Sequence, residues 1–198
     1  MASLVLASGS ASRNAMLRAA GVDVLVDPPD LDEGAVKQSC RARGFGTRKT
    51  AGVLATAKAE CVQGRHPGQF VLAADQMLEC DGEWFDKPVD RGSAARQIAR
   101  LAGRTHRLVT SAVVVSDGLI RWRANTSASM TVRPLSTEFI EGYLDRAGDR
   151  VFSSVGGYEI EGLGVQLFSV VKGDHFTILG LPLLQLLAFL RTLGVVPA

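Results

Sequence analysis

Residues 120–132, IRWRANTSASMTV, alternate between two kinds of position, and this stretch decides the fold. The even-numbered positions are mostly apolar, whereas the odd-numbered positions are polar or basic. A period of two over this length predicts a long, half-buried strand. A turn signal at Asp117-Gly118 precedes the stretch, and the apolar run Leu108–Val115 precedes that turn. The sequence therefore predicts a long antiparallel hairpin in the middle of the chain.

The segments on both sides of this hairpin carry strand and helix patterns. Apolar runs predict strands over Ser3–Ala7, Phe70–Ala74 and residues 158–171. Amphipathic spacing predicts helices over residues 11–20, 48–62, 93–102 and 136–148, and a final helix that begins at Pro182. The order predicts a mixed α/β fold. Because no linker or internal repeat separates the segments, we expect one domain over residues 1–198.

The composition is that of a folded protein without a strong charge. Of the 198 residues, 46% are apolar and 21% are charged, and the formal net charge is +2. A chain of this kind can bury a full core, which excludes a disordered protein. The small net charge gives little support to nucleic-acid binding. An RNA-binding module would depend on the basic run 37–49 alone, and such runs are usually solvated surface.

Several other protein classes lack the sequence features that they require. The longest apolar stretch, residues 178–190, is too short to span a membrane, and the N-terminus has no basic region typical of a signal peptide. The three cysteines are odd in number and widely spaced, so they indicate neither a disulfide framework nor a zinc site. No HExxH or GxSxG motif is present, so zinc proteases and α/β-hydrolases find no support. We expect a protein of a reducing compartment that binds neither membranes nor nucleic acids.

The turn Ser8-Gly9-Ser10, followed by Arg13, is the first candidate for chemistry. A strand that enters a helix through a Ser/Gly turn leaves free backbone N–H groups at the helix start. Those groups, two hydroxyls and a guanidinium suit an anion, in particular a phosphate. The same residues also fit an ordinary N-capping serine. A serine hydrolase built on Ser8 stays open as well, although no residue stands out as its base.

Two carboxylates and two lysines extend this candidate site. Asp75 follows a strongly apolar run, where a carboxylate can hold a divalent metal or take a proton from water, and Glu33 ends an acidic run. Lys58 lies between alanines of an expected helix, and a turn at Asp81-Gly82 would bring Lys87 back toward Asp75. Each residue also has a plain structural interpretation, such as a turn-forming aspartate or a lysine that reaches solvent. Together they predict metal-assisted hydrolysis of a polyphosphate.

These residues lie in stretches that resemble the Maf family of nucleoside triphosphate pyrophosphatases. No single stretch is decisive, but the set is specific, occurs in family order and covers nearly the whole chain. The matching stretches are LVLASGSASR (4–13), Asp32-Glu33, AKAECV (57–62), VLAADQMLECDGEWFDKP (71–88), LAGRTHRLVTSAVVV (101–115), GGYEIEGLG (156–164) and ILGLPLLQLLAFL (178–190).

The resemblance implies a cytoplasmic hydrolase that cleaves a nucleoside triphosphate between the α and β phosphates, with Mg²⁺ or Mn²⁺ as cofactor. It implies an elongated mixed sheet flanked by helices, with a cleft between two lobes as in Maf and ITPase-like proteins, and a homodimer. It also implies Asp75 as the proton acceptor, and Asp75 and Glu33 as metal ligands. Around them, the positions that line the phosphate and metal site are Ser8, Ser10, Arg13, Glu33, Lys58 and Lys87.

Three further positions imply a substrate preference. Ser12, Gln76 and Glu161 stand where the family branch that prefers dTTP and UTP has Arg, Thr and Gln. Gln76 and Glu161 resemble the branch that hydrolyses 7-methyl-GTP, and a carboxylate can accept both donors of a guanine edge. That branch often has an aromatic residue where this chain has Ser12, so a broader range of nucleotides is a second expectation. The competing class of function is a nucleotide-binding regulator of cell division without significant turnover.

Overall fold

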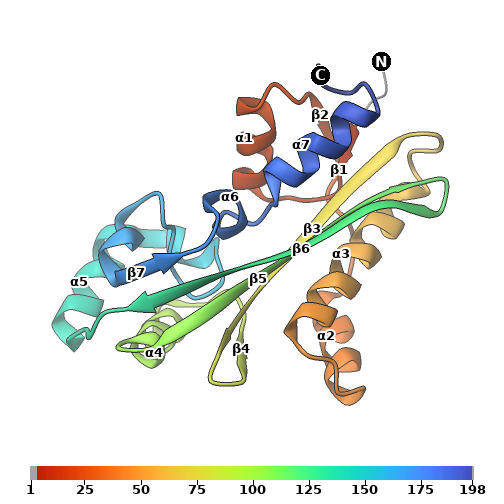
Figure 1. The fold of residues 1–198 in the computed structure, drawn as a ribbon. Helices are drawn as coiled ribbons and strands as arrows, with labels where there is room; N and C mark the ends of the chain where they lie inside the picture. Colours follow the sequence, from red (N-terminus) through yellow and green to blue (C-terminus); the bar gives the residue numbers. More distant parts are fainter. Residues whose placement is uncertain (1–3, 198) are drawn as a thin grey trace. The chain divides into compact units, whose positions relative to one another are not determined.

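A computed structural model describes residues 4–197 (Figure 1). Its strands form one mixed sheet in the order β2-β1-β3-β5-β6-β7, with β4 paired to β3. The pairs β1–β2 and β1–β3 are parallel, whereas β3–β4 and β6–β7 are antiparallel. The strands are β1 Leu4–Leu6, β2 Val24–Val26, β3 Phe70–Cys80, β4 Glu83–Phe85, β5 Thr105–Ser116, β6 Leu119–Val132 and β7 Phe168–Lys172.

The helices surround this sheet and confirm the mixed α/β class. The α-helices are α1 Ala11–Ala19, α2 Glu33–Ala42, α3 Thr47–Gln63, α4 Arg91–Leu101, α5 Thr137–Ala147, α6 His175–Ile178 and α7 Leu183–Thr192. Two 3-10 helices are η1 Gly148–Phe152 and η2 Leu163–Leu167. Within residues 4–197, no helix is both long and apolar enough to cross a membrane. Ser3, the expected start of the first strand, lies outside the described residues.

The two expected hairpins are present, and their turns explain their formation. Asp81 and Gly82 join β3 to β4 with φ angles of 52° and 82°. Asp117 and Gly118 join β5 to β6 with φ angles of 52° and 72°. Two successive residues with positive φ form the turn that matches the twist of paired strands. The alternation of burial along β6 is confirmed from Trp122 onward, although Ile120, which was expected on the buried side, is 38% exposed.

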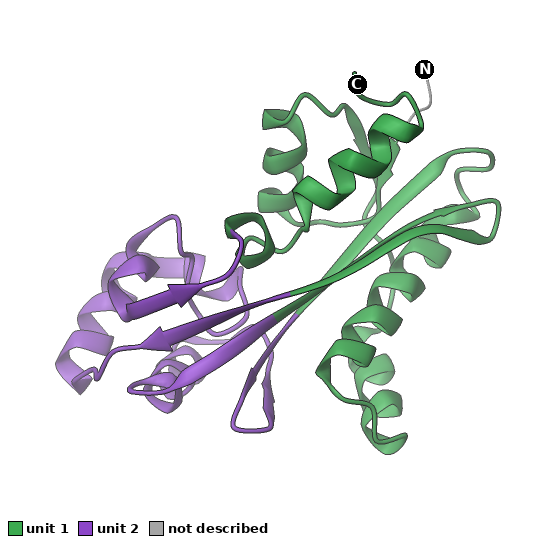
Figure 2. Cartoon of the chain, viewed as in Figure 1, with its two compact units in different colours: residues 1–76, 109–126, 175–198 green, residues 77–108, 127–174 purple. Residues whose placement is uncertain are grey.

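The chain forms two compact units (Figure 2). Unit 1 consists of residues 1–76, 109–126 and 175–198, and unit 2 consists of residues 77–108 and 127–174. Strands β3, β5 and β6 each contribute residues to both units. One domain over residues 1–198 and a cleft between two lobes stay predictions.

The sheet of unit 1 is covered on both faces, and its register determines which residues reach which face. Leu72 and Ala74 of β3 pack with residues of α1 and α7, whereas Val71 and Ala73 pack with residues of α3. Figure 1 shows α1 and α7 on one side of β1 and β3, and α3 on the other. Because successive strand residues point to opposite faces, residue 75 belongs to the α3 face and residue 76 to the opposite face.

Two expectations about elements are corrected by the structure. The strand expected to end at Ala74 continues to Cys80, because β3 pairs with β4 beyond that point. Residues 158–167 are not strand. A β-carbon on Gly164 would lie 2.5 Å from the Glu159 carbonyl oxygen, so this segment folds back on itself instead of extending. The acidic and basic runs lie mostly at the surface, as expected, and they contain β2 and α2, which the sequence did not predict.

Candidate active site

The turn after β1 forms a small polar cradle at the start of α1. Ser10 is the N-cap of α1, and its hydroxyl accepts a hydrogen bond from the backbone N–H of Arg13 at 3.4 Å. The N–H of Ser10 itself donates to Oγ of Ser8 at 3.2 Å, and Ser8 is buried. The structural interpretation of Ser10 as a cap is therefore confirmed. The same turn places the hydroxyls of Ser8 and Ser10 beside the start of the helix, where anions are favoured.

Arg13 points its guanidinium back over this turn. Its Nη1 donates to Oγ of Ser8 at 3.1 Å, and its Nε donates to the carbonyl oxygen of Gly180 at 2.8 Å. Burial lowers the pKa of Arg13, and the negative charges of Asp75 and Glu33 raise it part of the way back. An arginine remains a cation under these conditions. The guanidinium is thus a fixed positive charge in the field of both carboxylates.

Lys58 joins the two carboxylates of the expected site. Its Nζ lies 2.6 Å from Oδ1 of Asp75 and 2.9 Å from Oε1 of Glu33. The side chains of Lys58 and Asp75 are 9% and 7% exposed, whereas that of Glu33 is 44% exposed. Lys58 does not reach solvent as a lysine among alanines usually does, because the carboxylates hold its ammonium in the interior. Three side chains expected in the site thus meet within unit 1.

Asp75 lies inside β3 and not at its end, which corrects the expected position. The parallel pairing with β1 runs only as far as Leu6, which is opposite Leu72. Asp75 lies three residues beyond that point, on the face covered by α3. The strand that ends here is the neighbour, β1. The carboxylate therefore still lies where a parallel strand ends, which is where open α/β sheets bind their ligands.

The second carboxylate oxygen of Asp75, Oδ2, is the atom of the site that is best placed to bind a ligand. Oδ2 is buried and has no hydrogen-bond partner among the described residues. A buried carboxylate oxygen without a hydrogen-bond partner lowers the stability of the folded protein. Water, a metal ion or substrate bound to Oδ2 would remove this cost. Within residues 4–197, no cluster of three His, Cys, Asp or Glu side chains could hold a metal ion. Two carboxylates fit Mg²⁺ or Mn²⁺ when phosphate and water oxygens supply the remaining ligands.

Gln76 faces the opposite side of the sheet from Asp75. Its Nε2 lies 3.0 Å from Oγ1 of Thr110, 2.9 Å from the carbonyl oxygen of Thr177 and 3.1 Å from that of Ile178. The amide donors of Gln76 are therefore occupied by the protein, and Oε1 is the atom that it can still offer. Ser12 is exposed on α1.

Lys87 and Glu161 are exposed side chains of unit 2. Lys87 follows β4, whose Phe85 is opposite Leu78 of β3, so the hairpin expected before Lys87 is present. Glu161 lies between η1 and η2. The approach of these two side chains to Asp75 stays a prediction.

Sequence reasoning missed three residues that hold Gln76 and Arg13 in place. Thr110 and Thr177 are fully buried, and the Thr110 hydroxyl donates to the Thr177 carbonyl oxygen at 3.0 Å. The carbonyl oxygen of Gly180 accepts from Nε of Arg13, and the two residues lie 167 positions apart in the sequence. No local pattern marks such residues, since their partners come from distant segments. Thr110 and Gly180 fall within the family-like stretches 101–115 and 178–190, but nothing in those stretches singled them out.

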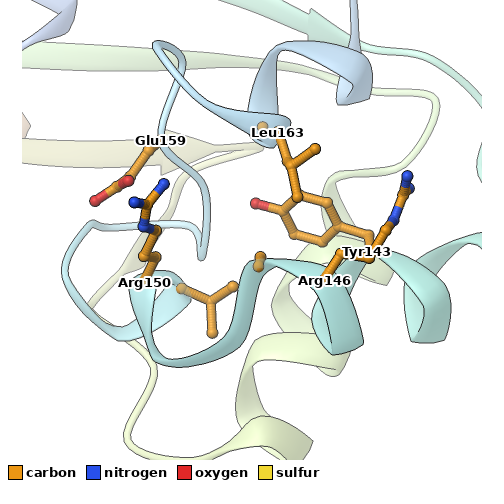
Figure 3. Close-up of a pocket in the computed structure, with 8 residues that line it drawn as sticks. Tyr143, Arg146, Arg150, Glu159 and Leu163 are labelled. Atoms are coloured by element: carbon orange, nitrogen blue, oxygen red, sulfur yellow. The ribbon is translucent and has the colours of Figure 1, made fainter.

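A small hollow within unit 2 is lined by residues of α5, η1 and the segment 159–164 (Figure 3). Arg150 and Glu159 lie on one side of it and Arg146 on the other. The Tyr143 hydroxyl donates to the carbonyl oxygen of Gly157, and burial raises the pKa of Tyr143 to about 12, so it stays protonated. The volume of ≈ 70 Å³ is far below that of sites for small organic ligands. None of the expected site residues lines this hollow.

Comparison with known proteins shows which family this chain is similar to. The "Nucleoside triphosphate pyrophosphatase" of Paramagnetospirillum magneticum is 50% identical, over 96% of this chain and 98% of the relative. The "7-methyl-GTP pyrophosphatase" of Mesorhizobium japonicum is 48% identical, over 98% of this chain and 97% of the relative. The solved structure of the Staphylococcus aureus Ham1 protein is 16% identical, with a TM-score of 0.43 over 66% of this chain and 71% of that one. The family model described as "Maf-like protein" matches residues 3–193, and the chain therefore belongs to the Maf family.

Proposed function

We propose that this protein hydrolyses a nucleoside triphosphate between the α and β phosphates, releasing the monophosphate and pyrophosphate. The observation that carries the proposal is the arrangement around Lys58. One ammonium holds Asp75 and Glu33 at 2.6 and 2.9 Å, while Oδ2 of Asp75 has no hydrogen-bond partner within residues 4–197. Arg13 and the Ser8-Gly9-Ser10 turn belong to the same unit and supply cationic and hydrogen-bond donor groups for phosphate oxygens.

In the proposed reaction Asp75 acts as the general base. Oδ1 is held by Lys58, which fixes the plane of the carboxylate and leaves Oδ2 to take a proton from water. The water oxygen attacks the α phosphorus, and the bond to the α–β bridging oxygen breaks as pyrophosphate leaves. Arg13 and Lys58 neutralise charge on the phosphate oxygens, and Lys87 is proposed to do the same for the leaving group.

Asp75 and Glu33 are the residues that would hold a divalent cation. Both supply hard carboxylate oxygens, and the half-exposed Glu33 is open to an ion that arrives with its substrate. When bound, Mg²⁺ or Mn²⁺ would draw negative charge from the triphosphate and help align it for attack. Lys58 keeps the two carboxylates close together before any ion arrives, which reduces their mutual repulsion.

Product identity tests this proposal directly. We expect equal amounts of nucleoside monophosphate and pyrophosphate when the purified protein meets a triphosphate with Mg²⁺ or Mn²⁺. Release of orthophosphate and a diphosphate would contradict attack at the α phosphorus. Tight nucleotide binding without product would favour the regulator over the enzyme.

The finer proposal is a preference for a guanine-type base such as that of 7-methyl-GTP. Glu161 supplies a carboxylate, which accepts from both guanine donors and favours a base made cationic by N7-methylation. Gln76 can add its free carbonyl oxygen, since its amide nitrogen is already bound. Both residues thus offer acceptors, which match a base edge that presents donors.

A substrate panel of 7-methyl-GTP, GTP, dTTP and UTP tests this preference. We expect Glu161→Gln to lower kcat/KM for the two guanine nucleotides relative to the two pyrimidine nucleotides by about tenfold, the cost of one carboxylate-type hydrogen bond. Glu159→Gln is the matched control, because it removes one negative charge from the same segment at a residue that accepts from the Ser153 hydroxyl at 2.8 Å and is not proposed to bind the base. An unchanged profile in Glu161→Gln would refute the role of this carboxylate.

A further inference from the structure

The segment from His175 to Gly180 offers backbone carbonyls to two side chains of the proposed site. The carbonyl oxygens of Thr177 and Ile178 accept from Gln76, and that of Gly180 accepts from Nε of Arg13. Helix α6 has only four residues, so its last carbonyls have few partners of their own and can serve side chains instead.

Gly180 lies so close to Arg13 that a β-carbon on it would displace the guanidinium by a few tenths of an ångström. A β-carbon on Gly180 would lie 3.3 Å from Nη2 and 3.4 Å from Nε of Arg13, which is tighter than ordinary van der Waals contact. The φ angle of Gly180 is +96°, a conformation that glycine adopts far more readily than other residues. The backbone conformation therefore favours glycine, and a side chain here would crowd Arg13.

The guanidinium of Arg13 is held at two of its five N–H groups. Nε donates to Gly180 and Nη1 donates once to Ser8, which fixes the plane of the group from both ends. The remaining N–H groups, those of Nη2 included, have no acceptor among residues 4–197. They are the donors that can receive a phosphate, and they need not be reordered when it binds.

We propose that Gly180 is a positioning residue, which acts through Arg13 and sets the orientation in which the guanidinium meets the triphosphate. This inference rests on the proposed function, since it requires that Arg13 bind phosphate. The missing side chain leaves room for the guanidinium, and the carbonyl holds Nε. A shift of a few tenths of an ångström at this point would turn the free donors away from a bound phosphate.

The test is Gly180→Ala, measured by kcat/KM for the triphosphate and by the inhibition constant of pyrophosphate. We expect kcat/KM to fall about 10–100-fold and pyrophosphate to bind more weakly, because misplaced donors lose both contacts. Gly194→Ala is the matched control. Gly194 also has a positive φ, +66°, but nothing lies within 4 Å of its β-carbon position, so this variant carries backbone strain without touching Arg13.

Arg13→Ala and the double variant decide whether Gly180 acts through the arginine. In the Arg13→Ala background, we expect Gly180→Ala to change kcat/KM by less than about twofold, because nothing is left to position. An additive effect there, or a loss in Gly180→Ala no larger than in Gly194→Ala, would overturn the inference while leaving the proposed function intact. Full activity of Arg13→Ala would instead remove the phosphate role of Arg13, and the inference with it.

Arg13→Lys tests the same inference if the Gly180→Ala protein does not fold. Lysine keeps the positive charge but cannot donate to Gly180 and Ser8 at once in a fixed plane. We expect Arg13→Lys to lose nearly as much activity as Arg13→Ala, with thermal stability close to that of the unaltered protein. Activity near the unaltered level would show that charge alone suffices and would overturn the positioning role.

Discussion

The buried side chains of Asp75 and His106 each have one atom without a hydrogen-bond partner among the described residues, but the groups around them differ. Asp75 in unit 1 has Lys58 at 2.6 Å, an unpartnered Oδ2, and a half-exposed Glu33 on the same ammonium. His106 in unit 2 has the Tyr158 hydroxyl at 2.6 Å, an unpartnered Nδ1, and aromatic rings around it. One group is surrounded by charges, and the other by rings.

The difference separates chemistry from packing. The ring centroids of Tyr158 and Phe168 lie 5.7 and 5.9 Å from that of His106, which is 1% exposed. Burial lowers the pKa of His106 to about 4, so it is a neutral member of an aromatic cluster at neutral pH. The groups beside Asp75 are instead charged: the buried ammonium of Lys58 and, on the same ammonium, the half-exposed carboxylate of Glu33. We therefore expect an unpartnered buried atom to indicate function where charged groups lie beside it, and packing where aromatic rings do.

Asp75→Asn should produce the largest effect, and it tests whether Asp75, unlike His106, takes part in the reaction. We expect kcat to fall about 10³-fold, because the amide cannot take the proton from water, while the similar shape keeps the fold intact. Steady-state kinetics and thermal unfolding measure the two effects separately. Asp145→Asn, on the exposed surface of α5, is the control and should leave kcat unchanged. Retained activity in Asp75→Asn would make Asp75 a structural residue.

Lys58→Met should lower both activity and stability. The variant leaves Asp75 buried without its cation, at a cost of about 3–5 kcal/mol in the free energy of unfolding. Urea denaturation measures this loss. Adding Asp75→Leu should restore most of the stability and none of the activity, since an apolar pair can replace a buried ion pair. If the double variant is as unstable as Lys58→Met, the loss comes from packing and not from the unpaired charge.

Acid should destabilise the protein through His106. The pKa of His106 is about 4 in the folded protein, against 6.5 as the ordinary value. The unfolded chain therefore binds the extra proton first, and stability is lost as pH falls from about 6.5 toward 4, by roughly 3 kcal/mol for this group. Urea denaturation at several pH values measures the slope, and His106→Leu should flatten it. The lowered pKa of Asp27, about 2, acts only below that window.

Tyr158→Phe should have the smallest effect. It removes the hydrogen bond to Nε2 of His106 and leaves the imidazole with a second unpaired nitrogen, at about 1–3 kcal/mol in the free energy of unfolding. Activity at neutral pH should not change, which kinetics at a temperature well below unfolding can establish. A large loss of activity at full stability would mean that the aromatic cluster takes part in function after all.

Local signals predicted much of the fold. The alternation in residues 120–132 predicted β6, and the two Asp-Gly pairs predicted the hairpin turns. Ser10 was interpreted as a possible helix cap, and it caps α1. The errors fell where tertiary context overrides local pattern. Residues 158–167 were predicted as strand, but the segment folds back so that Gly164 lies against the backbone of Glu159. Strand β3 continues beyond Asp75 because its pairing partner is supplied by another segment.

The site was predicted in type but not in arrangement. Charge and position in the sequence selected Asp75, Lys58, Glu33 and Arg13 as candidates. The prediction missed Thr110, Thr177 and Gly180, which carry no charge and form no periodic pattern. Their part depends on backbone carbonyl groups and on the close approach of Gly180 to Arg13, and residue type reveals neither.

The sequence by itself determined which groups are available: two carboxylates, an arginine and a lysine near a Ser/Gly turn, along a chain whose alternation builds a mixed sheet. Tertiary structure decided which of them meet. Asp75 reaches Lys58 because residue 75 falls on the α3 face, and Gln76 reaches Thr177 because residue 76 falls on the other. Arg13 meets Gly180 across 167 residues. Such contacts depend on strand order and register, which arise from packing the whole sheet and not from any local pattern.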